Sequence, residues 1–314
     1  MTGSQPVPGC AVAIATRDRG HRITPLLESL RASDFTDFEA VIVDQSTNDE
    51  TEQAVAPFLT DDRFTYVRSD QRGLSRARNL AVSMTTAPII AVTDDDCILS
   101  NDWLDLMLES INTDDRVAVV FCNVEPVPVS EPGYTPHIRF EEAHTLTTAR
   151  QAWSRARSGL CLGAGMAVRR EAIEGLGGFD NELGAGARFG STEDNDLSWR
   201  ALIAGWKVRH DPAPVVLHDG FRNSTELRAL VVRDFFGVGG GISKHVRTRQ
   251  PGALMFLFSW LWRFGIAEPA RQVLSGRRPN GFRRPVELMK GFTAGLRSPF
   301  DPATIKFIDP EQPA

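Results

Sequence analysis

The sequence predicts an α/β protein with a mostly parallel central sheet, followed by a helical C-terminal extension. Short runs rich in β-branched residues alternate with helical patterns, and such alternation is typical of a parallel sheet with helices on both faces. Beyond Thr225 the pattern is wholly helical. We therefore expect an α/β domain over residues 1–222 and a helical extension over residues 223–314.

The alternation can be followed from the N-terminus. The expected strands are residues 10–15, 39–44, 64–68, 88–93, 117–122 and 213–218. The expected helices are residues 23–33, 50–58, 74–84 and 102–111, and a further helix from Glu193. A proline-rich stretch at 125–134 predicts a long loop, and a glycine-rich run precedes Glu193. Ligands of such sheets bind beyond the carboxyl ends of the strands.

The composition argues against some classes of protein and indicates the state of the cysteines. The formal net charge of −5 argues against a protein that coats nucleic acid, because that role needs a basic field. The four cysteines show no CxxC or Cys/His spacing, so we expect free thiols. The first residues lack the pattern of a signal peptide, and we expect a cytoplasmic protein.

Three carboxylates, Asp94, Asp95 and Asp96, directly follow the expected strand at 88–93. Mg²⁺ or Mn²⁺ would relieve their repulsion and can bridge carboxylates to substrate phosphates. Alternation along an extended segment would place Asp94 and Asp96 on the same side. A cluster that caps the following helix is an equally good interpretation of these residues alone.

Other polar residues occupy similar positions at strand and helix ends. Asp44 ends the second strand and can accept a hydrogen bond from a base or a ribose, or cap a turn. Arg76, Arg78 and Asn79 lie near a helix N-terminus, where guanidinium groups suit a diphosphate or form a solvated face. His218 closes the last strand and can complete a metal shell or be purely structural.

Glu193 and Asp194 begin a helical pattern after the glycine-rich run. A carboxylate that projects from this position into a cleft can deprotonate an acceptor hydroxyl. Acidic residues in a first helical turn are also ordinary partners of the helix dipole.

Taken in order, the motifs resemble those of the inverting family 2 glycosyltransferases of GT-A fold. The resemblance runs roughly from Ala11 to His218 through VAIATRDR, VIVDQSTND, GLSRARNLA, IIAVTDDDC, GAGMAVRREAIEGLGGFD and STEDNDLSWRALIAGW. Several motifs in the right order are far more specific than any one of them. The resemblance implies a nucleotide-sugar donor, a hydroxyl acceptor and Mn²⁺ or Mg²⁺.

The resemblance also implies roles for individual residues. Asp194 would be the catalytic base, and Glu193 would help to position the acceptor. Asp96 would be the direct metal ligand, together with Asp94 and with His218 as a further ligand. The nucleotide would be bound by Thr16, Arg17, Asp44, Arg78, Asp94 and Asp95. Because the middle residue of the DxD motif is itself an aspartate, the sequence leaves open whether Asp94 or Asp95 faces the nucleotide.

The extension contains two further features. Gly239–Gly241 interrupt a helical run beside Arg233, Lys244, Arg247 and Arg249, which suggests binding of an acceptor phosphate such as that of a lipid-linked diphosphate. Residues 253–262 are crowded with Phe and Trp, and are either a helix in a membrane interface or a core helix. They are too few to span a bilayer, which takes about 20 residues.

Two other functions fit parts of the pattern. A sugar nucleotidyltransferase also needs metal-binding carboxylates, but its first strand usually leads into a glycine-rich phosphate loop, and here that strand leads into ATRDRGHR. A non-catalytic module that binds a nucleotide sugar or a glycan would not require an acid at Asp194.

Overall fold

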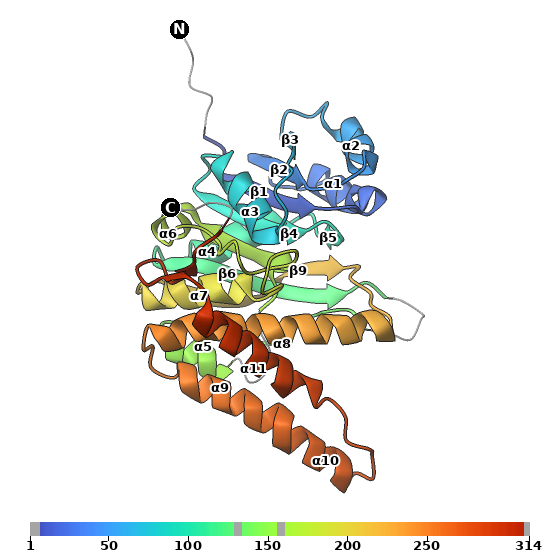
Figure 1. The fold of residues 1–314 in the computed structure, drawn as a ribbon. Coiled ribbons are helices and arrows are strands. Elements are labelled where there is room, and N and C mark those ends of the chain that lie inside the picture. The colour runs from blue at the N-terminus through green and yellow to red at the C-terminus, as the bar shows by residue number, and fades with distance from the viewer. Residues whose placement is uncertain (1–6, 129–133, 156–160, 311–314) are drawn as a thin grey trace.

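The computed structural model describes residues 7–128, 134–155 and 161–310. A twisted sheet forms the α/β part, helices cover its two faces, and the helices of the extension stack beyond one face (Figure 1). Residues 129–133 of the predicted proline-rich loop lie outside the described ranges. The described part of that stretch begins as strand, because β6 (Val117–Pro126) continues past the predicted end at residue 122.

Within the described ranges, nine strands form the sheet in the order β3-β2-β1-β4-β8-β6-β9-β5, with β7 also paired to β9. Besides β6 they are β1 (Cys10–Thr16), β2 (Phe38–Asp44), β3 (Phe64–Arg68), β4 (Ile89–Asp94), β5 (Cys97–Leu99), β7 (His144–Leu146), β8 (Met166–Arg169) and β9 (Lys207–His218). Six of the nine run in one direction, whereas β5, β7 and β8 run opposite to them. The predicted mostly parallel sheet is thus confirmed, with short antiparallel strands inserted.

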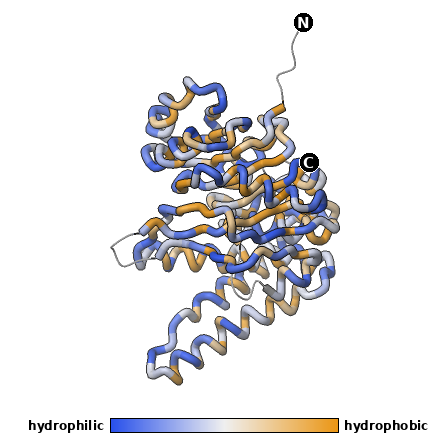
Figure 2. The backbone as a smooth tube through the Cα atoms, turned by 180° about the vertical axis from the view of Figure 1, so that it is seen from behind, coloured by the Kyte–Doolittle hydropathy of each residue, from blue (hydrophilic) through white to orange (hydrophobic). Residues whose placement is uncertain are grey.

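The helices divide between the two faces of the sheet. Side chains of α1 (Thr24–Arg31), α2 (Glu50–Val55) and α4 (Trp103–Ile111) pack against one face. The opposite face carries α3 (Leu74–Ser83), α5 (Ala149–Arg155), α6 (Arg170–Gly175) and α7 (Glu193–Ile203). Strand side chains alternate between these two cores, so both faces of the sheet are apolar, and orange segments run through the middle of the molecule in Figure 2.

The extension is helical, as predicted. It contains α8 (Ser224–Arg247), α9 (Ala253–Trp262), α10 (Glu268–Leu274) and α11 (Arg283–Arg297), followed by a small hairpin of β10 (Phe300–Asp301) and β11 (Lys306–Phe307). A capping box starts α8: the Asn223 side chain accepts from the N–H groups of Thr225 and Glu226, and the Glu226 carboxylate accepts from the Asn223 N–H.

The glycines of α8 do not interrupt the helix, so that prediction is wrong. They lie where α8 crosses α11 and the glycine-rich segment: a Cβ on Gly239 would stand 2.1 Å from the Leu288 carbonyl oxygen, and one on Gly240 would stand 2.2 Å from the Phe189 ring. Gly291 of α11 meets the Phe236 carbonyl in the same way. The absence of side chains lets the two helix backbones approach closely, and tertiary packing outweighs the low helix propensity of glycine.

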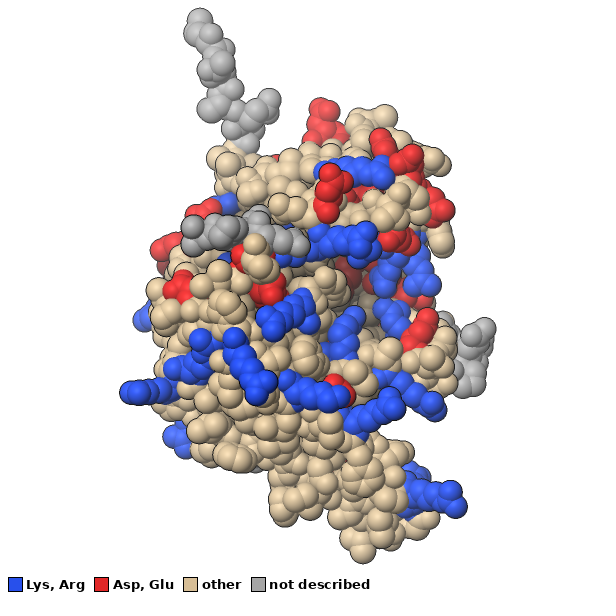
Figure 3. Space-filling model, viewed as in Figure 1, with Lys and Arg blue, Asp and Glu red and all other residues tan. Residues whose placement is uncertain are grey.

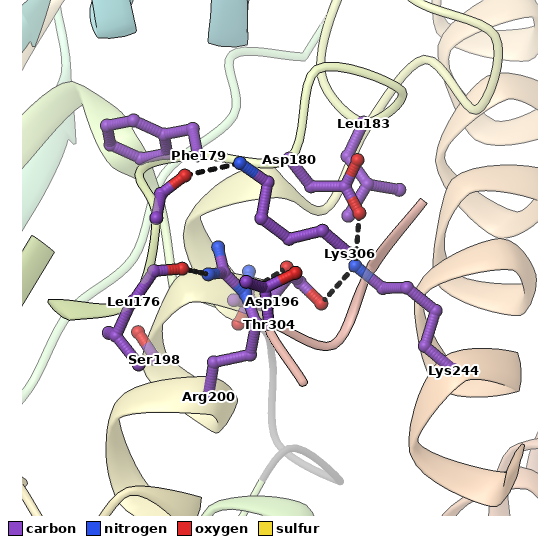
Figure 4. Close-up of polar contacts among 12 residues, drawn as sticks. Leu176, Phe179, Asp180, Leu183, Asp196, Ser198, Arg200, Lys244, Thr304 and Lys306 are labelled. Atoms are coloured by element: carbon purple, nitrogen blue, oxygen red, sulfur yellow. Dashed lines mark hydrogen bonds and ion pairs between the residues drawn. The ribbon is translucent and has the colours of Figure 1, made fainter. Parts of the chain in front are cut away.

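A buried charge network joins α7 to α8 (Figure 4). Lys244 pairs with Asp180 and, at 2.8 Å, with Asp196 Oδ1, while Arg200 Nε donates to Asp196 Oδ2 at 2.8 Å. All of these side chains are inaccessible to solvent. Burial alone would raise the pKa of Asp196, but the charges of Lys244 and Arg200 lower it. The network fixes the first turn of α7 against the extension.

Candidate active site

Several strand and helix ends meet around one cavity. Parallel pairing aligns Ala15 of β1 with Asp94 of β4, and Thr16 with Asp44 of β2, so the carboxyl ends of these strands lie at one edge of the sheet. The N-terminal ends of α3 and α7 lie at the same edge. The cavity has a volume of about 430 Å³, within the range usual for small-molecule sites, and α8 contributes one of its walls.

The acidic run lies in the turn between β4 and β5. Asp94 is the last residue of β4, and Asp95 and Asp96 form the turn that leads into β5. Helix α4 begins only at Trp103, with Asp102 at its N-cap position. The three carboxylates are therefore not a helix cap, and all of them line the cavity.

Asp94, Asp96 and His218 form a group that has the geometry to hold a metal ion. One ligand atom from each of these residues lies within 4.8 Å of the others. His218 reaches the acidic turn because it pairs with Cys97, the neighbour of Asp96, in the antiparallel β5–β9 ladder. The geometry thus brings together the three residues that the sequence suggested as metal ligands.

The tautomer of His218 suits a metal ligand. Its Nδ1 lies 3.0 Å from the Pro136 carbonyl oxygen, which can only accept, so Nδ1 carries a proton. The other ring nitrogen, Nε2, lies 3.2 Å from Asp96 Oδ1 and can bind a cation when it gives up its proton. Two carboxylates and one imidazole are donors that suit Mn²⁺ and Mg²⁺, so the group fits the predicted cation.

Arg19 lies beside two of the aspartates and was not predicted. Its Nη1 is 2.8 Å from both Asp95 Oδ1 and Asp96 Oδ2, and Asp95 also accepts a hydrogen bond from the Thr16 hydroxyl. Burial raises the pKa of Asp95 to about 6, although Arg19 acts in the opposite direction. Burial would also raise the pKa of Asp96, but the hydrogen bond and charge of His218, with Arg19, bring it to about 2. In the sequence, Arg19 is the second arginine of the motif ATRDR, and this position after the first strand is the signal that could have identified it.

Arg78 connects the acidic turn to α7. Its Nη2 donates to Asp94 Oδ1 and its Nη1 donates to Glu193 Oε1, each at 3.1 Å. The guanidinium is almost fully buried, although it lines the cavity. Asp94 is the more exposed partner, with 32% of its side chain accessible. Asp94 therefore presents a carboxylate to the cavity, whereas Asp95 is held by Thr16 and Arg19.

Asp194 lies at the cavity wall in the first turn of α7. Its Oδ1 accepts from the backbone N–H of Asn195 at 2.6 Å and from the Asn195 side chain at 2.7 Å. Burial raises the pKa of Asp194 to about 7, and the negative charge of Glu193 adds to the shift. Burial also raises the pKa of Glu193, against the charge of Arg78. Asp194 can therefore exchange a proton near neutral pH.

The residue before this pair has an unusual backbone. Thr192, at the N-cap of α7, has a φ of 82°. This left-handed conformation is rare for a β-branched residue, and its cost is of order 1–3 kcal/mol. Thr192 also lines the cavity. The chain is thus held in a strained conformation next to Glu193 and Asp194.

Of the residues predicted to bind the nucleotide, some line the cavity, whereas Asp44 is buried beside it. Thr16 and Arg17 line the cavity. Asp44 is fully buried, accepting from the Ser46 N–H and from the Tyr66 hydroxyl, and its neighbour Gln45 lines the cavity.

Several polar residues that the sequence suggested for phosphate binding serve the fold instead of the cavity. Arg76 pairs with Asp309, and Asn79 donates to the Phe179 carbonyl in the glycine-rich segment. Lys244 belongs to the buried charge network, and Arg247 donates to the Ser298 carbonyl. Of the cations flanking Gly239–Gly241, Arg233 is the one that lines the cavity.

Basic side chains gather on the face shown in Figure 3, where α8 meets the α/β part. Arg222 and Arg233 line the cavity as well. The cavity therefore combines carboxylates with several guanidinium groups, a set of side chains suited to a phosphorylated ligand and a cation.

Comparisons with known proteins agree with this geometry. The family model described as glycosyl transferase family 2 matches residues 11–177. A pre-mycofactocin glycosyltransferase of Mycobacterium tuberculosis is 29% identical over 184 residues, which cover 57% of this chain and 36% of that protein. A glucosyl-dolichyl phosphate glucuronosyltransferase of Haloferax volcanii is 24% identical over 244 residues, 75% of each chain.

The fold is also found among solved structures. A mannosyltransferase from Pyrobaculum calidifontis, in complex with GDP-Man and Mn²⁺, superposes with a TM-score of 0.61 at 18% identity, covering 93% of this chain and 88% of that one. The sheet and its helices are those of the GT-A fold. With more than half of its length matched by the family model, this chain belongs to glycosyltransferase family 2.

Proposed function

We propose that this glycosyltransferase moves a sugar from a nucleoside-diphosphate sugar to a hydroxyl group with inversion at the anomeric carbon, in a metal-dependent reaction with Asp194 as general base. One observation carries the proposal: Asp94, Asp96 and His218, the three candidate metal ligands, line the same cavity as Asp194. A buried carboxylate whose pKa is near 7 is suited to accept a proton at neutral pH.

The donor would bind along the carboxyl ends of β1 and β4. Thr16, Arg17 and Gln45 lie where the nucleoside would enter, and Asp44 supports that wall from behind through Ser46 and Tyr66. When bound by Asp94, Asp96 and His218, Mn²⁺ or Mg²⁺ would neutralise charge on the diphosphate leaving group. The mannosyltransferase with GDP-Man and Mn²⁺ supports this class of donor and cation.

The acceptor would approach from the α7 and α8 side. Asn195 holds Asp194 Oδ1 through two hydrogen bonds, which leaves Oδ2 for the acceptor hydroxyl. Arg78 fixes Glu193 beside it, and Glu193 would help to orient the acceptor. Attack by the deprotonated oxygen on the face opposite the leaving group would invert the anomeric centre.

A lipid-linked acceptor is consistent with the cavity. Arg222 and Arg233 line the cavity and offer guanidinium groups for an acceptor phosphate. The Haloferax volcanii relative is named for a dolichyl phosphate substrate, which supports an acceptor of this kind.

Binding and transfer can be tested separately. A thermal-shift panel with UDP-, dTDP- and GDP-sugars, with and without Mn²⁺, should reveal a metal-dependent rise in melting temperature for at least one donor. Asp194→Asn should retain that rise but transfer sugar about 10²–10⁴-fold more slowly. The configuration of the product, measured by proton NMR, should be opposite to that of the donor.

Asp49→Asn serves as the control, because it alters an exposed acid outside the cavity. It should change neither the binding of the nucleotide sugar nor the transfer of the sugar. Wild-type rates in Asp194→Asn would remove Asp194 as the base. The absence of any metal-dependent shift across the panel would contradict the donor and cation assignments together.

A further inference from the structure

The outer surface of the extension carries an unusual concentration of exposed apolar side chains. We call residues 253–286, which comprise α9, a π-helical turn at 263–267, α10 and the start of α11, the arm. Among the residues that the structure describes, ten large apolar side chains are at least half exposed, and all but Val7 lie in the arm. They are Leu254, Met255, Phe258, Trp262, Ile266, Val273, Leu274, Phe282 and Val286.

These side chains are arranged as a stripe. Met255, Phe258, Trp262 and Ile266 follow one another at intervals of three or four residues, so they share one side of the helix. The other side of α9 is already occupied, because Phe256, Leu257 and Trp260 are buried against the main core. The helix is therefore apolar on both sides, and only its inner side is needed by the fold.

The arm is basic although the whole chain is acidic. It contains six arginines and one acid, Glu268, which pairs with Arg284 at 2.7 Å. The chain as a whole has a formal net charge of −5. Arg263, Arg271, Arg277, Arg278 and Arg283 are exposed. In Figure 3 the lower part of the molecule shows mostly uncharged surface, with a group of basic side chains at its right.

We propose that the arm lies in the interface of an anionic lipid membrane, with the stripe from Met255 to Ile266 inserted among the acyl chains and the arginines at the headgroups. Large apolar residues flanked by arginines are typical of interfacial helices. Within the described part of the chain, no helix is long and apolar enough to cross a bilayer, so the arm lies on the membrane and does not span it. A second copy of the chain fits this surface less well than a membrane does, because pairing of two arms would bring their arginines together and the like charges would repel.

The arm is fixed relative to the active-site cavity. Leu230, Arg233 and Asp234 of α8 line the cavity, and α8 also packs against α9 and α11. The close glycine contacts between α8 and α11 leave little freedom between them. Docking of the arm would therefore set the orientation of the cavity above the membrane surface.

Vesicle flotation with the full chain tests the proposal. The protein should float with vesicles made of equal parts phosphatidylcholine and phosphatidylglycerol, and should float less with phosphatidylcholine alone or at high salt. The double variant Phe258→Ser/Trp262→Ser should lower the fraction that floats by about tenfold or more. A matched variant, Leu59→Ser/Met84→Ser, removes two exposed apolar side chains from the α/β part and should float like the wild type.

Trp262 offers a direct readout of insertion. It is 62% exposed, whereas Trp103, Trp153, Trp199 and Trp260 are buried, so a blue shift of tryptophan emission on vesicle addition should come mainly from Trp262. Trp262→Phe should keep flotation and lose most of that shift. The proposal is overturned if the protein stays at the bottom with anionic vesicles, or if Phe258→Ser/Trp262→Ser floats normally. It is equally overturned if light scattering shows a dimer that this variant converts to monomer, without vesicle binding.

Discussion

The imidazole of His218 faces the carboxylate of Asp96, with Nε2 3.2 Å from Oδ1. The two side chains come from strands that are distant in sequence, and the pairing of β5 with β9 brings them together. Their approach raises the pKa of His218, because the hydrogen bond and charge of Asp96 outweigh the effect of burial, which would lower it. A cation bound here would take the place of the proton on Nε2.

We therefore expect His218→Ala to weaken Mn²⁺ binding by roughly 10–100-fold, and Asp96→Asn to weaken it at least as much. Titration of free Mn²⁺, followed by electron paramagnetic resonance, measures this directly and without a sugar acceptor. The exposed His21→Ala variant should bind like the wild type. Unchanged Mn²⁺ affinity in both site variants would exclude this group as the metal centre.

The rate of sugar transfer should depend on pH through Asp194. Its pKa of about 7 means that the carboxylate is largely protonated below that pH and unable to act as a base, so the rate should rise as the pH increases through about 7. Glu193→Gln removes a negative charge that raises this pKa, so the rising limb should move to lower pH. A profile measured at saturating substrate tests both statements.

The exposed Glu52→Gln variant should leave the profile unchanged and serves as the control. A shift of the Glu193→Gln profile to higher pH would have the wrong sign for the proposed coupling.

The buried network around Lys244 should be sensitive to loss of one partner. Lys244→Met removes the positive charge that pairs with Asp180 and Asp196 in a site without solvent. The variant should lower the free energy of unfolding by about 3–5 kcal/mol. Lys290→Met removes an ion pair with Glu287 from an exposed lysine and should cost no more than about 1 kcal/mol. Urea unfolding gives both values.

The double variant Lys244→Met/Asp180→Asn should recover part of the loss, because it removes one charge of each sign. Equal stability of the Lys244→Met and Lys290→Met proteins would show that the network contributes no more than a surface pair.

The close contact between α8 and α11 predicts the effect of an added methyl group. Gly239→Ala would place a Cβ 2.1 Å from the Leu288 carbonyl oxygen and 2.6 Å from the Phe292 nitrogen, so the helices must separate. We expect a loss of about 1–3 kcal/mol in thermal unfolding. Gly175→Ala in α6 meets nothing within 4 Å and should be neutral or stabilising by about 1 kcal/mol. Equal effects at the two positions would contradict the packing argument.

Much of the fold could be predicted from the sequence because local pattern and global fold agree in the α/β part. The β-branched runs at β1, β2 and β4 are buried on both faces, and the order of the motifs indicated the parallel sheet. The short antiparallel strands β5, β7 and β8 could not be predicted, since three or four residues carry too little periodicity and their positions depend on partners far along the chain.

The residues of the candidate site also fall into those that the sequence could identify and those that it could not. Asp94, Asp96 and Asp194 were identifiable because each lies at the end of a regular element, where local sequence indicates the position. Arg19 and Asn195 were missed, because what they contact depends on tertiary packing. Lys244 was predicted to face a phosphate, and it turns inward instead because the neighbouring glycines let α8 approach the core.

The cavity is built from two separate stretches of the chain, and this has an evolutionary consequence. The family match at residues 11–177 includes the acidic turn, but Asp194, His218 and the α8 wall lie beyond it. Under the proposed reaction, the shared stretch supplies most of the donor site, and the later stretch adds His218 and the side that faces the acceptor. Substitutions in α8 could then change which acceptor is glycosylated while Asp94 and Asp96 stay in place.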